Sequence, residues 1–126
     1  MRRLFWWGLG FELGVGVHLL DHLRRGLAPF VAGGTLPFLI VGPLALFGVW
    51  RARRWGAALM AVVALGGLTF GVWEHLIHSG SDHVRTMPWP STLLTLSTLG
   101  VAVPLAWISL RALGLGPLRL DRNRGA

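Results

Sequence analysis

The stretch WGAALMAVVALGGLTFGVWEHLIH, residues 55–78, decides the fold because it carries no charged residue before Glu74. A helix that crosses a bilayer needs about 20 mostly apolar residues, and this stretch is long enough. Residues 4–20, 27–50 and 92–113 meet or nearly meet the same requirement. We therefore predict an all-α, polytopic membrane protein. Its residues 1–126 would form one integral membrane domain, a bundle of four transmembrane helices that ends in a short basic tail at 114–126.

The composition agrees with lipid as the solvent. Of the 126 residues, 53% are hydrophobic and only 13% are charged, whereas a soluble domain is about 25% charged. The absence of cysteine excludes disulfides, thiolate metal sites and thiol catalysis. The net charge of +7 would favour nucleic-acid binding in a soluble chain. Here the arginines lie in short clusters between apolar runs, so we expect a lipid bilayer as partner and no nucleic acid.

The distribution of arginines predicts the orientation. The predicted first and third loops hold only Arg24, Arg25 and Arg85. The N-terminus, second loop and tail hold the rest: Arg2, Arg3, Arg51, Arg53, Arg54, Arg111, Arg119, Arg122 and Arg124. By the positive-inside rule, both termini are then cytoplasmic, and we expect a bacterial inner membrane. A cleaved signal peptide at 1–20 is the alternative, but no small-x-small cleavage site follows it.

Nearly all the histidines and acids lie in two segments. One contains Glu12, His18, Asp21 and His22, and the other contains Glu74, His75, His78, Asp82 and His83. The first segment reads HLLDHLR, and the second repeats H-L-I and then D-H-V-R after four inserted residues. A proline and an aromatic residue follow each segment, at 29–30 and 88–89. The chain therefore resembles a tandem repeat of two helix pairs, with the first and third helices parallel.

Helical spacing predicts a metal site between these two helices. His18, Asp21 and His22 share one helix face, and Glu74 lies one turn from His78. We expect Asp82 to join this group only if the helix continues through residues 79–81, and His83 belongs either to the site or to a loop. The candidate ligands are His18, Asp21, His22, Glu74, His75, His78, Asp82 and His83. Nitrogen and oxygen donors suit Zn, Fe or Mn, with Cu(II) as a further candidate.

Other functions remain open at this stage. Glu12 or Glu74 could act as a general base if the protein is a metal-dependent membrane oxidoreductase or hydrolase. His18 and His75 could instead be the axial ligands of a b-type haem. The chain could also be a non-catalytic accessory subunit of a larger membrane complex, or a homo-oligomer that relays protons or cations. The HxxxH of His18 and His22 resembles the histidine boxes of membrane di-iron hydroxylases and desaturases, but the chain lacks their adjacent histidine pairs.

Two further patterns concern helix packing. The GxxxG pairs Gly10–Gly14 and Gly67–Gly71 predict close helix approach. Ser91, Thr95 and Thr98 share one stripe of the last helix, and we expect their hydroxyls to bond local backbone carbonyls.

Overall fold

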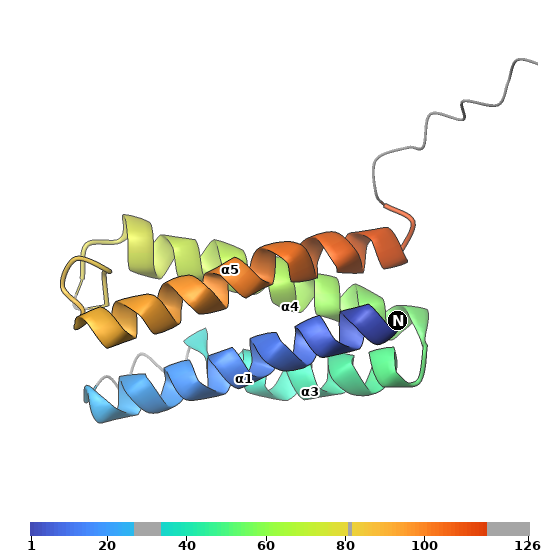
Figure 1. The fold of residues 1–126 in the computed structure, drawn as a ribbon, viewed down its shortest axis with the longest axis horizontal. Coiled ribbons are helices and arrows are strands. Elements are labelled where there is room, and N and C mark those ends of the chain that lie inside the picture. The colour runs from blue at the N-terminus through green and yellow to red at the C-terminus, as the bar shows by residue number, and fades with distance from the viewer. Residues whose placement is uncertain (27–33, 81, 116–126) are drawn as a thin grey trace, which may run out of the picture.

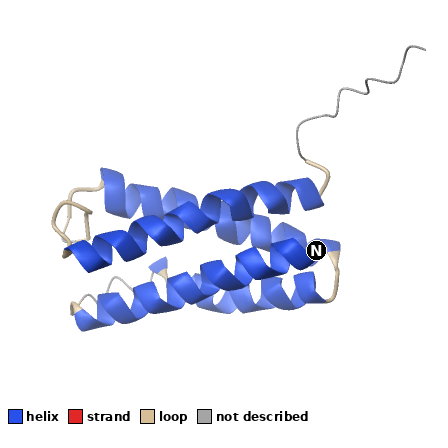
Figure 2. Ribbon diagram, viewed as in Figure 1, coloured by secondary structure: helices blue, strands red, loops and turns tan. Residues whose placement is uncertain are grey.

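The computed structural model describes residues 1–26, 34–80 and 82–115, and within them the chain is helical without a strand (Figure 2). The helices are α1 (Arg2–Arg24), α3 (Leu36–Trp50), α4 (Arg54–Val72) and α5 (Trp89–Ala112), and α4 runs directly into the π-helical turn η1 (Trp73–Ile77). The predicted all-helical fold of four helices is confirmed for these residues. Outside them lie the start of the predicted second span, the 29–30 pair of the repeat, Ser81 and the tail beyond residue 115.

The four helices form an antiparallel bundle (Figure 1). α1 packs on α3 and α5, and α4 packs on the same two helices, so α1 and α4 lie diagonally across the bundle. The N-terminus, the turn between α3 and α4 and the end of α5 share one end of the bundle. The end of α1, η1 and the start of α5 lie at the opposite end. The two polar segments therefore reach the same end on parallel helices, as the sequence predicts.

Local sequence explains where the helices begin and end. Gly26, with φ of +76°, follows the last turn of α1 in a left-handed conformation that glycine adopts without strain. Pro37 stands in the first turn of α3, where its missing N–H costs no helical bond. Pro88 precedes α5 as its N-cap, in an extended conformation. Gly26 and Pro88 therefore mark the end of α1 and the start of α5, at the end of the bundle where the polar segments lie.

A close approach between two helices lies at a glycine pair that the sequence pattern does not single out. A Cβ on Gly48 would lie 2.6 Å from the Cα of Gly56, so α3 and α4 meet backbone to backbone. In the predicted pairs, Gly14, Gly67 and Gly71 do face side chains of other helices, but Gly10 faces open space. The GxxxG prediction therefore fails at Gly10. Small residues elsewhere allow the same tight packing, since Ala45, Ala57, Ala64 and Ala102 are fully buried.

The outer surface of the bundle is apolar on every helix. Leu13, Ile40, Val62 and Val103 each expose more than half of their surface, one on each helix. Two helices, Arg54–Ile77 and Trp89–Ala112, are long and apolar enough to cross a membrane, by length and composition alone. α3 is a shorter apolar helix of 15 residues.

Candidate metal centre

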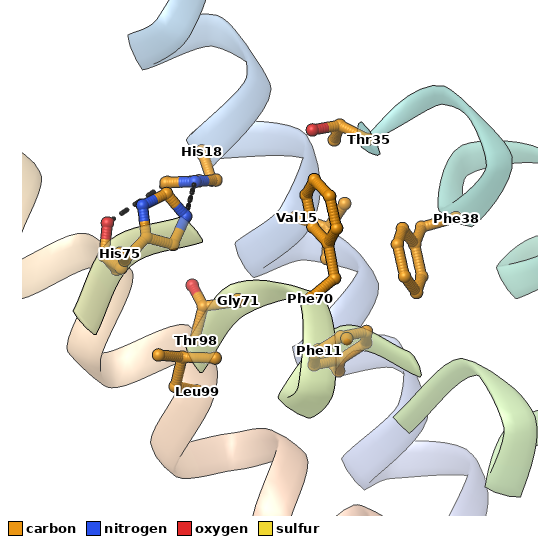
Figure 3. Close-up of a pocket in the computed structure, with 12 residues that line it drawn as sticks. Phe11, Val15, His18, Thr35, Phe38, Phe70, Gly71, His75, Thr98 and Leu99 are labelled. Atoms are coloured by element: carbon orange, nitrogen blue, oxygen red, sulfur yellow. Dashed lines mark hydrogen bonds between the residues drawn. The ribbon is translucent and has the colours of Figure 1, made fainter. Parts of the chain in front are cut away.

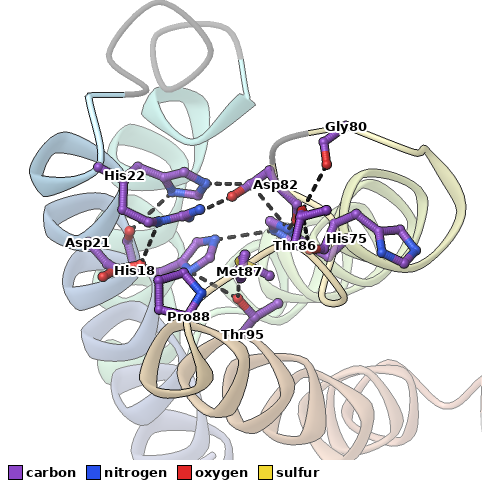
Figure 4. A network of polar contacts seen from close by, with 12 residues as sticks. His18, Asp21, His22, His75, Gly80, Asp82, Thr86, Met87, Pro88 and Thr95 are labelled. Carbon is purple, nitrogen blue, oxygen red and sulfur yellow. Dashed lines mark hydrogen bonds and ion pairs between the residues drawn. The ribbon is translucent and has the colours of Figure 1, made fainter.

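Three histidines and one aspartate meet (Figure 4) at the end of the bundle opposite the N-terminus and the end of α5. His18 and His22 come from α1, His75 from η1 and Asp82 from the segment that leads to α5. Each offers one ligand atom, and all four atoms lie within 4.8 Å of one another. The three imidazoles are buried, and Asp82 is partly exposed. This group, which we call the histidine cluster, could hold a metal ion.

α1 supplies two of the four ligands because His18 and His22 are four residues apart and so share one helix face. The Nδ1–H of His22 donates to the backbone carbonyl of His18 at 3.1 Å. This bond directs the Nε2 of His22 outward from α1, where it lies 2.5 Å from the Oδ2 of Asp82. The Nδ1 of His18 lies 3.5 Å from the hydroxyl of Thr95 on α5.

The π-helical turn η1 supplies His75. Its wider turn is closed by the N–H of His78, which donates to the carbonyl of Trp73 at 2.7 Å. π-Helical turns are rare and occur most often at functional sites, because they change the direction in which a side chain leaves the helix. In η1 the side chain of His75 is buried and its Nε2 lies 3.2 Å from that of His18. The Nδ1–H of His75 donates to the backbone carbonyl of Asp82 at 2.9 Å.

Asp82 reaches the cluster although the helix ends before it. The helical conformation stops after Ile77, and His78 is extended. The N–H of Val84 donates to the carbonyl of His75 at 2.9 Å, so the chain folds back onto η1. The expectation that Asp82 joins only through a continuous helix is therefore wrong. Instead, the segment that folds back from η1 brings both the backbone carbonyl and the carboxylate of Asp82 to His75.

Arg25 holds the aspartate in place, and the sequence analysis missed this role. Its guanidinium donates to Asp21 at 3.0 Å and to Asp82 at 2.5 Å, which joins α1 to the returning segment. Burial alone would raise the pKa of the Asp82 carboxyl, but hydrogen bonds from His22, His75 and Arg25 hold that pKa well below its usual range. Asp82 therefore stays ionised. The i,i+4 spacing of Asp21 and Arg25 in the sequence indicates the first of these two ion pairs, but nothing in the sequence indicates the pair with Asp82.

Several predicted ligands lie outside the cluster. Asp21 bonds to Arg24 and Arg25. Glu74 and His78 approach each other at 3.4 Å, and the side chain of His78 is 53% exposed. The Nδ1 of His83 accepts the backbone N–H of Arg85. Four of the eight candidate ligands are thus brought together, and the other four have separate partners.

Neither candidate general base lies at the cluster. Glu74 is turned outward with His78. Glu12 is buried deeper in the bundle, where its carboxyl contacts Gly42 of α3.

An apolar cavity of about 60 Å³ adjoins the cluster (Figure 3). His18 and His75 form its polar wall, and most of the remaining lining is apolar: Phe11, Val15, Phe38, Phe70 and Leu99. Threonines complete it, including Thr95 and Thr98. The hydroxyl stripe of α5 therefore faces inward at this level. The local bond predicted for it is confirmed at Thr98, which donates to the carbonyl of Leu94. It is wrong at Ser91, whose hydroxyl has no partner among the described residues, and at Thr95, whose hydroxyl faces His18.

The chemistry of the cluster is that of nitrogen and oxygen ligation. The Nδ1 atoms of His22 and His75 each contact a backbone carbonyl, which directs the Nε2 of both rings toward the other members of the cluster. Such second bonds fix the tautomer and orientation of metal-binding imidazoles. The Nε2 of His22 donates to the ionised Asp82 in this structure, and a bound ion would take the place of that proton. No known protein family, curated protein or solved structure matches the chain.

Proposed function

We propose that the chain is a membrane-spanning bundle that binds one divalent transition-metal ion through His18, His22, His75 and Asp82. The observation that carries the proposal is the convergence of three imidazoles and a carboxylate, with Nδ1 of His22 and His75 engaged by carbonyls. A tetrahedral ion with bonds of about 2.0–2.1 Å places its ligand atoms about 3.3 Å apart. The Nε2 atoms of His18 and His75 are 3.2 Å apart, which is close to that spacing.

Zn²⁺ is the ion that this ligand set fits best. Four nitrogen and oxygen ligands from the protein match a closed tetrahedral site, and catalytic zinc sites usually keep one position open for water. Fe²⁺, Mn²⁺ and Cu²⁺ accept the same donor atoms. Since both candidate bases, Glu12 and Glu74, lie outside the cluster, we favour binding or passage of the ion over hydrolysis.

The spacing of the histidines favours an ion over haem. Axial ligation from both sides would place the macrocycle between the Nε2 atoms of His18 and His75. These atoms are 3.2 Å apart, and the ring of His22 packs against that of His18. A haem would have to separate both contacts.

The apolar exterior supports a position within a bilayer. Large exposed apolar surface is rare on soluble monomers, and here it covers all four helices. The arginine distribution favours cytoplasmic ends for the chain, with the histidine cluster near the non-cytoplasmic face. The tryptophans agree with two interfaces, because Trp6, Trp50 and Trp55 are exposed at one end and Trp89 at the other.

Metal content of purified protein tests the proposal. The protein is prepared in detergent without a histidine tag from cells grown with Zn, Fe, Mn and Cu, and metals are measured by plasma mass spectrometry. We expect about one ion per chain in the wild type, and loss of that ion in His18→Gln and His75→Gln. The matched controls are His78→Gln and His83→Gln, which remove histidines from the same region and should keep the ion.

The outcomes separate the candidate functions. Absence of a stoichiometric ion, or equal loss in the two control variants, would reject the cluster as the site. A Soret band in the visible spectrum would favour haem instead. Circular dichroism and size-exclusion chromatography of each variant distinguish loss of the ion from loss of the fold.

A further inference from the structure

Glu12 is a buried acid without a partner. It lies in the middle of α1, is 9% exposed, and neither carboxyl oxygen has a hydrogen-bond partner in the described part of the chain. Its carboxyl occupies the space that Gly42 of α3 leaves free, because a Cβ at Gly42 would overlap it. A structural acid is expected to pair with a donor when buried, so this one requires another explanation.

The surroundings leave no cation for Glu12 to pair with. α3, over Leu36–Trp50, contains no ionisable residue. On α5 the only ionisable residue is Arg111 in the last turn, where its guanidinium stacks on Trp107. On α4 the only one is Arg54, its first residue, and on α1 no ionisable residue lies within a turn of Glu12. An ionised carboxylate in such a place is strongly disfavoured.

A proton is the ligand that suits Glu12, because the surroundings do not suit a metal cation. Ca²⁺ and Mg²⁺ require about six or more oxygen ligands. No described residue hydrogen-bonds to the carboxyl oxygens of Glu12, and α3, against which it packs, has no second carboxylate. A proton needs only the carboxyl itself. The apolar cavity lies between Phe11, which precedes Glu12, and His18, so it adjoins the stretch of α1 between Glu12 and the cluster.

We propose that Glu12 is a proton-binding site within the bundle, separate from the histidine cluster, that holds a proton at neutral pH and exchanges it with water. This site does not depend on a bound metal, so a test of it is independent of the proposed metal centre.

Infrared spectroscopy of the metal-free protein tests this proposal. A protonated carboxylic acid gives a carbonyl stretch above the amide I band, and an exchangeable proton shifts that band in D₂O. At pH 7 we expect the band in the wild type, its shift in D₂O, and its loss in Glu12→Gln. The matched control is Glu74→Gln, which alters an acid that is partly exposed and paired with His78, and it should keep the band.

Each other result contradicts the proposal. Absence of the band at pH 7, or its survival in Glu12→Gln, would show that Glu12 does not hold the proton. A band that does not shift after long incubation in D₂O would show a fixed neutral acid without exchange. Helical content by circular dichroism confirms that both variants are folded.

Discussion

The Nε2 atoms of His18 and His75 lie 3.2 Å apart, although α1 and α4 are diagonal in the bundle and share few contacts. The histidine cluster therefore connects the two diagonal helices at one end of the bundle. A bound ion would add a direct link between the two helices that the packing keeps apart. Binding to the folded state alone stabilises that state by mass action, so the ion should stabilise the whole bundle.

The orientation of the chain can be measured because it contains no cysteine. Arg53 and Arg85 are both exposed, and they lie in the connections at opposite ends of the bundle. We expect Arg85→Cys to react with a membrane-impermeant maleimide in intact cells, and Arg53→Cys to react only after permeabilisation. Equal labelling of both variants in intact cells would contradict a membrane-spanning bundle with this orientation.

Acid should release the metal. Imidazole ligands must be neutral to bind an ion, and the ordinary pKa of histidine is about 6.5. We expect wild-type protein to lose its ion progressively as the pH of the dialysis buffer falls below neutrality, because protons compete with the ion for the imidazole nitrogens. His83→Gln should follow the same curve, because His83 lies outside the cluster. Full retention of the ion at pH 4 would indicate ligands other than histidine.

Asp82 should make the stability of the metal-free protein depend on acid pH. Its pKa is lowered in the folded state, so its stabilisation is complete above the unfolded value of about 3.9 and decreases as the pH drops below it. We therefore expect Asp82→Asn to unfold at a lower temperature than the wild type at pH 6. The difference should shrink as the pH falls below about 4. Thermal unfolding followed by circular dichroism measures both, and a constant difference from pH 6 to pH 2.5 would contradict the assignment.

The contact between α3 and α4 should not tolerate a methyl group. A Cβ on Gly56 would overlap the backbone of Gly48, so Gly56→Ala should destabilise the bundle by about 1–3 kcal/mol through overpacking. Gly10→Ala is the matched control, since Gly10 is helical and faces open space. It should be neutral or stabilising by up to about 1 kcal/mol, because alanine favours helix. Denaturant titration in detergent gives both values, and equal effects would argue against the close approach.

The apolar pattern of the sequence predicts the helices, because surface and core positions are both apolar and the breaks carry arginine, glycine and proline. The parallel course of α1 and α4 also follows from the order of the helices. The Gly48–Gly56 approach does not follow, since it joins two glycines on different helices. No single-helix spacing rule selects such a pair.

The candidate site could be predicted only in part. The i,i+4 spacing correctly places His18 and His22 on one face. At residues 74–78 the same spacing also brings Glu74 and His78 together, but on a face that lies outside the cluster. The sequence does not indicate that the neighbouring face, which carries the buried His75, is the one that points inward. The contributions of Asp82 and Arg25 depend on a tertiary fold-back that sequence periodicity does not encode.

The histidine cluster joins residues far apart in the sequence, so its ligands become available at different times during synthesis. His18 leaves the ribosome 57 residues before His75, and chains fold largely from the N-terminus onward as they emerge. In the nascent chain, His18 and His22 of α1 therefore lack their partners His75 and Asp82 until η1 and the segment that leads to α5 have been synthesised. The histidine cluster can only be completed late, after α1, α3 and α4 have been synthesised, and an ion supplied earlier would find only two of the four candidate ligands.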